Sequence, residues 1–241
     1  YEAVQHRLNP GGIFSQWVQG YEVDSPTIRL VYSTLASVFP HVETWVTEPN
    51  DLLFVCHQQP PAYTKDQLRQ RVAAPPFKEA LSRVWMVDSV DGFLARYYAG
   101  PAFARAIAGQ ERRVNTDDAN FLEFGFARTL HLGGSFKASD IMLVAMRSQL
   151  DFPGHWPVSV EPARLLEERF LMCAAHDNPF ELPVGLQGEA QARSEAILAS
   201  VRGDFPTVLR RWQGEPRSLM ARLLLAEAVA HAGTPDQGRS M

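Results

Sequence analysis

The stretch that decides the fold is a turn followed at once by an apolar strand, Asn9-Pro10-Gly11-Gly12-Ile13-Phe14-Ser15-Gln16-Trp17-Val18. Its first four residues are strong turn and helix-stop signals. Ahead of them, Tyr1, Val4 and Leu8 recur at helical spacing, which predicts an amphipathic helix. A Rossmann-like fold carries its glycine-rich nucleotide loop after its first strand, yet neither GxGxxG nor GxxxxGK[ST] occurs in this chain. We therefore expect Ile13–Val18 to be a late strand of such a sheet, with the nucleotide-binding part upstream.

Outward from this strand, the pattern alternates between helix and strand. Ser25-Pro26 predicts a helix start, with Ser as N-cap and Pro at the first helical position, and apolar residues at helical spacing follow. Val42–Thr47 is β-branched and aromatic, and Leu52–Cys56 is continuously apolar, so both should be strands. The turn signal at 49–51 makes them antiparallel neighbours.

The rest of the chain reads as helical. Residues 60–114 are expected to form helices interrupted by prolines, and residues 129–138 to form a linker around Gly133-Gly134. Beyond the linker, helical faces are predicted near 141–145, 162–173, 189–202, 206–212 and 218–232, with a loop at 177–188. We expect residues 139–241 to form a small helical bundle or a short region of tetratricopeptide-like hairpins. A solenoid would need about three repeats, more than this segment holds.

Composition restricts the class of protein. The 241 residues carry a net charge of −4, which gives no basic footprint for nucleic acid. No apolar run approaches the roughly 18 residues of a membrane span. The two cysteines, Cys56 and Cys173, sit in apolar runs and are expected to be buried free thiols, which fits a cytoplasmic environment. The histidines form no zinc motif, so neither a metal nor a cofactor is expected in this chain.

Three segments together resemble spermidine-synthase-like proteins, the polyamine aminopropyltransferases and their relatives. They are Leu8–Trp17, Val38-Phe39-Pro40-His41-Val42 with the strand pair after it, and Asn115-Thr116-Asp117-Asp118 followed by Phe121-Leu122-Glu123-Phe124. The last of these is similar to the longer branch of the family, which is often fused to a membrane region. The resemblance covers residues 1–128. It implies an α/β methyltransferase-like fold, with strands five to seven of a seven-stranded sheet here and the seventh strand antiparallel.

The resemblance also implies a function for the parent protein, which is transfer of an aminopropyl group from decarboxylated S-adenosylmethionine to a polyamine. An aspartate accepts the amine proton in such enzymes, and the family places it, like the glycine loop, before the fifth strand. This chain would then be the C-terminal part of a transferase and not catalytically complete. Whether the parent is anchored in a membrane upstream stays open. The family's tyrosine between the last strands is missing from Thr47–Asp51, so the acceptor itself is not fixed.

The candidate substrate-binding residues are Gln16, Trp17, Tyr21, Asp117 and Asp118. The resemblance places Gln16 near an amine pocket, although a strand-end glutamine can equally bond the nearby backbone. Trp17 and Tyr21 could stack on a ligand or pack in the core. The two aspartates could hold a cationic amine, although the Asn-Thr-Asp-Asp cluster is favoured as a helix cap.

Two further expectations concern partners. A sheet that starts at a late strand exposes the edge of Ile13–Val18, and such an edge pairs with other chains, so a homo-oligomer is expected. The competing interpretation of the whole chain is non-catalytic: a helical-repeat scaffold or protein-interaction module.

Overall fold

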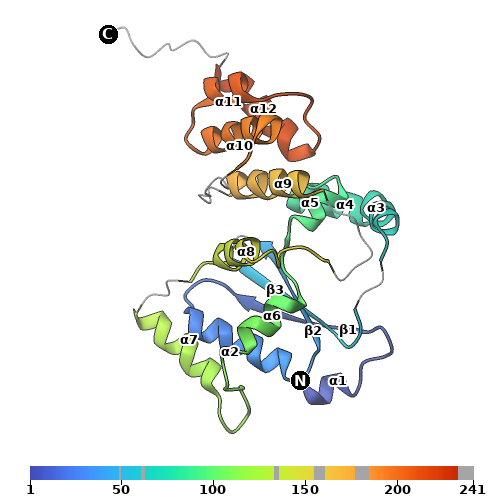
Figure 1. Ribbon diagram of the computed structural model, residues 1–241, viewed down its shortest axis with the longest axis vertical. Coiled ribbons are helices and arrows are strands. Elements are labelled where there is room, and N and C mark those ends of the chain that lie inside the picture. The colour runs from blue at the N-terminus through green and yellow to red at the C-terminus, as the bar shows by residue number, and fades with distance from the viewer. Residues whose placement is uncertain (49, 61–62, 133–135, 155–160, 177–184, 233–241) are drawn as a thin grey trace. The chain divides into compact units, whose positions relative to one another are not determined.

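The computed structural model describes residues 1–48, 50–60, 63–132, 136–154, 161–176 and 185–232. The protein is mixed α/β, with a four-stranded antiparallel sheet and many helices (Figure 1). The chain divides into two compact units, each built from two segments. The first unit comprises Tyr1–Thr64 and Arg96–Val158, and the second comprises Lys65–Ala95 and Ser159–Met241. The division expected from sequence groups residues 65–95 with the first region, whereas these compact units group them with the C-terminal helices.

The first unit contains all four strands and five helices of the described chain. In chain order these are α1 (Glu2–Gln5), β1 (Ile13–Gln19), α2 (Ser25–Ala36), β2 (His41–Glu48), β3 (Asp51–His57), β4 (Tyr97–Ala99), α6 (Pro101–Ala108), α7 (Phe121–Leu132) and α8 (Ala138–Arg147). Helix α1 is a single turn. The strand order is β1-β3-β2-β4. Because β3 runs antiparallel to both β1 and β2, those two strands point in the same direction.

The pairing expected between 42–47 and 52–56 is confirmed, since β2 and β3 form an antiparallel hairpin. Pro49, in the predicted turn, lies outside the described residues. Two sequence expectations are wrong. Residues 97–99 form strand β4 and not helix, because three residues are too few to display an alternating pattern. Asp24, not Ser25, is the N-cap of α2, and its carboxylate accepts the Thr27 N–H at 2.8 Å.

The core of the first unit lies on the sheet face that α2 covers. Alternate strand residues point to opposite faces, so the paired residues Gln16, Phe54 and Thr44 share one face across three strands. Tyr32 of α2 reaches this face and bonds Thr44, with 2.6 Å between the two hydroxyl oxygens. Its ring also makes an edge contact with Phe54. We call this the helix-covered face.

Three helices of the first unit pack on one another. α2 lies against both α6 and α7 (Figure 1). The contact with α7 is close because Gly125 has no side chain. A Cβ atom there would lie 2.5 Å from the Thr27 hydroxyl oxygen. The Asn115 N–H donates to the Thr34 hydroxyl at 2.9 Å and so fixes the segment leading into α7. Of the linker predicted at 129–138, residues 129–132 belong to α7 and residue 138 begins α8. Residues 133–135 lie outside the described chain.

In its described residues the second unit is helical throughout. It contains α3 (Lys65–Ala73), α4 (Phe77–Ala80), the π-helical turn η1 (Leu81–Trp85), α5 (Val90–Leu94), α9 (Pro162–Ala175), α10 (Gly188–Val201), α11 (Phe205–Arg211) and α12 (Leu219–Ala232). α10 packs against α9 and α11, α12 packs against α11 and returns to α9, and α5 packs on α9. The helices predicted near 162–173, 189–202, 206–212 and 218–232 are confirmed, whereas 177–184 of the predicted loop lie outside the described residues.

Candidate functional site

Gln16 is half-buried on the helix-covered face of β1. Its Nε2 donates to the backbone oxygen of Trp17 at 2.8 Å, and its Oε1 accepts the Tyr1 hydroxyl at a long 3.5 Å. Burial and, secondarily, the nearby Cys56 raise the pKa of Tyr1 above its usual value, so this hydroxyl keeps its proton. The amide therefore makes one firm bond to backbone and one weak bond that a ligand could replace.

The other aromatic candidates lie apart from Gln16. Trp17 projects from the opposite face of β1, in the row of Leu53 and Trp45, and is 49% exposed. Tyr21 follows the strand end and is 47% exposed. Because adjacent strand residues alternate faces, a ligand on the face of Gln16 would not stack on Trp17.

The two aspartates are exposed and have no hydrogen-bond or ion-pair partner among the described residues. Asparagines supply the oxygens that bond helix N–H groups at the start of α7. Asn115 Oδ1 accepts an N–H of the first turn at 2.9 Å, and Asn120 Oδ1 accepts the Glu123 N–H at 3.3 Å. Glu123 Oε2 in turn accepts the side-chain Nδ2–H of Asn120 at 2.8 Å, which holds the two side chains together at the start of the helix. The cluster therefore bonds the helix start through Asn115, helped by Asn120 just after it, while Asp117 and Asp118 face solvent.

A buried acid–base pair lies on the opposite face of the sheet and was not predicted. Glu43 is 1% exposed, and its Oε2 lies 3.6 Å from Nε2 of His57. The Trp45 indole N–H donates to the same oxygen at 3.2 Å. The signal available in the sequence was a carboxylate inside an otherwise β-branched and aromatic strand. Since buried charges need such partners, the arrangement reads as an internal pair that satisfies Glu43.

Neither cysteine can serve as a nucleophile near neutral pH. Burial, with a smaller effect of the Glu43 charge, raises the pKa of the Cys56 thiol to about 12, and burial raises that of Cys173 to about 11. The reactive thiolate is therefore scarce at both positions. Both are free and buried, as predicted. Within the described ranges, no group of three or more His, Cys, Asp or Glu side chains is arranged to hold a metal ion.

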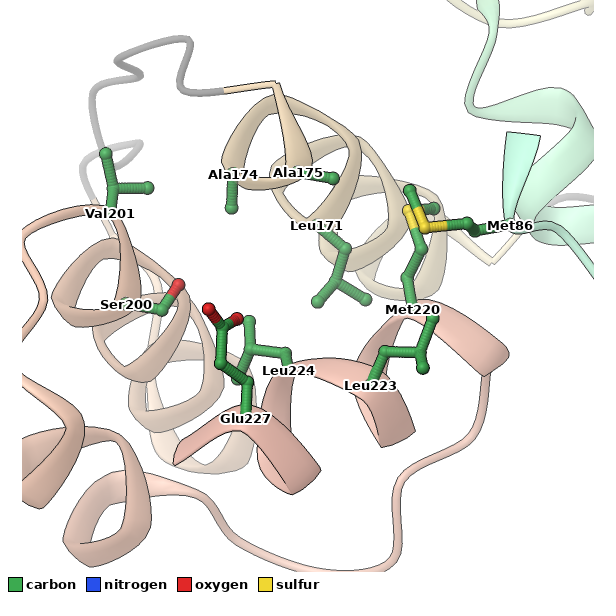
Figure 2. Close-up of a pocket in the computed structure, with 10 residues that line it drawn as sticks. All are labelled: Met86, Leu171, Ala174, Ala175, Ser200, Val201, Met220, Leu223, Leu224 and Glu227. Atoms are coloured by element: carbon green, nitrogen blue, oxygen red, sulfur yellow. The ribbon is translucent and has the colours of Figure 1, made fainter. Parts of the chain in front are cut away.

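A cavity of about 390 Å³ opens in the second unit between α9, α10 and α12 (Figure 2). Leu171, Leu224 and Met220 are among its apolar walls, and Met86 closes one side. The polar side chains that line it are Ser200 and Glu227, and Figure 2 shows both turned toward the cavity space. The volume lies in the range of small-molecule sites, which is roughly 300–1,000 Å³.

A second acidic group is buried on α9 itself. Glu168 is 3% exposed, and burial raises its pKa to about 7, with smaller contributions from the charges of Glu167, Asp88 and Asp91. Asp91 is also buried, and its Oδ2 lies 3.3 Å from Nη1 of Arg164. A carboxylic acid with a pKa near neutrality can exchange a proton at physiological pH. Because Glu168 is buried within the helical packing, its main effect is on the stability of the second unit.

Comparison with protein-family models, curated proteins and solved structures finds no match to this chain. In the part of the chain that the structure describes, no helix combines the length and apolarity needed to cross a membrane.

Proposed function

We propose that residues 1–128 form the C-terminal part of a spermidine-synthase-like transferase, with strands five to seven of a Rossmann-like, methyltransferase-type sheet. In the parent, the reaction would be aminopropyl transfer from decarboxylated S-adenosylmethionine to a polyamine. This chain would not be catalytically complete, because it contains no glycine loop and no candidate for the aspartate that accepts the amine proton. The cytoplasmic setting belongs to the same proposal and rests on two free thiols, which suit a reducing compartment.

The observation that carries the proposal is the direction of three strands. The implied fold requires its seventh strand to run antiparallel to the fifth and sixth. Here β3 runs antiparallel to both of its neighbours, and β1 and β2 point the same way on either side of it. α2 connects β1 to β2, as a parallel pair needs a crossover helix. A simple meander of three strands would have given the order β1-β2-β3 instead.

Gln16 is the residue by which the proposal can be tested. A polyamine near β1 should replace the weak bond between its Oε1 and the Tyr1 hydroxyl. Gln19 is a matched control, because it is a glutamine of the same strand on the opposite face. We expect spermidine to shift the side-chain amide signals of Gln16, and not those of Gln19, in a ¹⁵N NMR titration. Equal shifts of both glutamines, or of neither, would contradict an amine site on this strand.

Nucleotide binding gives an independent test. Calorimetric titration with 5′-methylthioadenosine, the by-product of aminopropyl transfer, should give no binding heat. Clear binding would contradict the proposal that the cofactor-binding part is absent from this chain. Spermidine formation from putrescine and decarboxylated S-adenosylmethionine would contradict it as well.

A second candidate function is protein interaction through the second unit. α10, α11 and α12 pack successively on one another, as neighbouring helices do in helical-repeat modules. This function and the proposed transferase role would use different residues, since the sheet and these helices belong to different units. It would make the chain a scaffold whose partner binds the helices.

A further inference from the structure

We propose that the cavity between α9, α10 and α12 binds an alkylammonium ion, with the ammonium group at Glu227 and the hydrocarbon chain along the apolar walls (Figure 2). The inference does not depend on the transferase proposal, because every residue that lines the cavity belongs to the second unit.

Charge complementarity selects the ligand. Glu227 is the one ionisable residue among those lining the cavity, and it makes no hydrogen bond or ion pair with any described residue. The Ser200 hydroxyl donates its proton to the Ile197 carbonyl at 2.7 Å, so it faces the cavity as an acceptor. The polar end therefore offers acceptors and a negative charge. An ammonium group has three donors and a positive charge and satisfies both, whereas a carboxylate or phosphate would be repelled.

The remaining walls restrict the rest of the ligand to hydrocarbon. Leu171, Leu224 and Met220 present alkyl and thioether surface, which cannot hydrogen-bond a second polar group. Each methylene taken out of water onto such walls should strengthen binding by about fourfold. Affinity should thus rise with chain length until the cavity of about 390 Å³ is filled.

The backbone at Met86 supports a binding role for this space. Met86 follows the π-helical turn η1 and has φ 55° and ψ 34°, a left-handed conformation that side-chain-bearing residues rarely adopt. Its side chain enters the cavity wall beside that of Met220 in Figure 2. π-Helical turns and strained residues concentrate at ligand sites, because the surrounding structure must hold them in place.

The methionines provide a way to locate the ligand. Six are present in the chain, and two of them, Met86 and Met220, line the cavity. With ¹³C-methyl-labelled methionine in the full chain, n-hexylammonium chloride should shift these two methyl signals saturably with one common dissociation constant. Met142, buried in the first unit, is the internal reference and should not move. 1-Hexanol, which has the same chain and no charge, should bind at least tenfold more weakly.

Three variants complete the test. Glu227→Gln should weaken hexylammonium binding at least tenfold and leave hexanol binding unchanged. Glu215→Gln removes the same charge from an exposed position outside the cavity and should leave both constants unchanged. Ala174→Leu keeps the charge but fills space, so it should weaken both ligands. Absence of saturable shifts at Met86 and Met220, equal binding of amine and alcohol, or wild-type affinity in Glu227→Gln would each overturn the proposal.

Discussion

Nη1 of Arg193, on α10, donates to both carboxylate oxygens of Glu167, on α9, at 3.0 Å to Oε1 and 3.1 Å to Oε2. Arg193 is only 1% exposed, yet its other nitrogens are also bonded. Nε donates to the Gln213 carbonyl at 2.8 Å, and Nη2 donates to the Glu215 carbonyl at 3.0 Å. The guanidinium also lies over the ring of Trp212, 5.1 Å from its centroid. One buried side chain thereby joins two helices and the segment between α11 and α12.

We predict that Arg193→Met lowers the free energy of unfolding of the second unit by about 3–5 kcal/mol, because it leaves Glu167 and two carbonyl groups without their partner. Urea denaturation followed by circular dichroism would measure the loss. Arg202→Ala is the control, since Arg202 is exposed and should change stability by about 0.5 kcal/mol or less. A loss no larger in Arg193→Met than in the control would show that these bonds add nothing to folding.

Glu168 predicts a pH dependence of stability. Its pKa in the folded protein, about 7, exceeds the ordinary value of 4.5. The folded state therefore holds a proton that the unfolded chain releases, and stability falls as pH rises from about 4.5 to about 7. The full loss above this window is about 3 kcal/mol, from 1.36 kcal/mol for each pKa unit. Below pH 4.5 both states are protonated and the penalty vanishes.

Glu168→Gln replaces the ionisable carboxyl by a neutral amide and should make the second unit more stable at pH 8 by up to about 3 kcal/mol, with little change at pH 5. Unfolding curves at both pH values, with Glu215→Gln as the matched exposed control, would measure this difference. A variant whose stability follows the wild-type pH profile would show that Glu168 does not carry this dependence.

Local patterns sufficed for much of this fold. The strand Ile13–Val18 and the hairpin after Pro40 can be predicted from sequence, because their β-branched and apolar runs end at turn residues. The C-terminal helices can be predicted as well, because their apolar residues repeat at helical spacing. β4 gives no such signal, because it has three residues and is a strand only through its pairing with β2. The compact unit that contains residues 65–95 and the C-terminal helices depends on contacts such as that between α5 and α9, which join positions far apart in sequence and leave no local pattern.

The candidate sites were harder to predict for the same reason. Gln16 and Asn115–Asp118 could be selected from sequence, but whether their side chains meet depends on the sheet register and on the placement of α7. The pair Glu43–His57 joins two strands, and the cavity at Glu227 joins three helices and Met86. Each of these is a product of tertiary packing, and a single carboxylate at an exposed helix position carries no signal of a cavity.

Gly125 allows α7 to lie close to α2, and this predicts a steric penalty for any side chain there. Gly125→Ala gains helix propensity of about 1 kcal/mol, but its Cβ would lie 2.5 Å from the Thr27 hydroxyl oxygen. That hydroxyl is held by a 2.5 Å bond to Asp24, so it cannot move without losing a cap contact. We expect a net loss of about 1–2 kcal/mol in thermal or urea unfolding of the first unit. Gly154→Ala, with no atom within 4 Å of its Cβ, should be neutral, and equal effects in the two variants would contradict the close packing.

The outer edge of β1 predicts self-association. β1 ends the strand order, so within the described chain its outer backbone groups have no strand partner. Ile13 and Trp17 beside it are 54% and 49% exposed. Unpaired edges of this kind add strands from other molecules unless a charge or a proline blocks them. We therefore expect a concentration-dependent dimer or larger assembly in sedimentation velocity.

Trp17→Lys should weaken this assembly at least tenfold, because it places a charge on the exposed face of the edge strand. Phe124→Lys makes the same substitution on α7, where Phe124 is 73% exposed, and should leave the association constant unchanged. Comparison of the two variants distinguishes edge pairing from non-specific hydrophobic association, since both variants remove an exposed aromatic ring and add one charge. A wild-type chain that stays strictly monomeric at high concentration would refute assembly through β1, and equal weakening by both variants would assign it to apolar surface elsewhere.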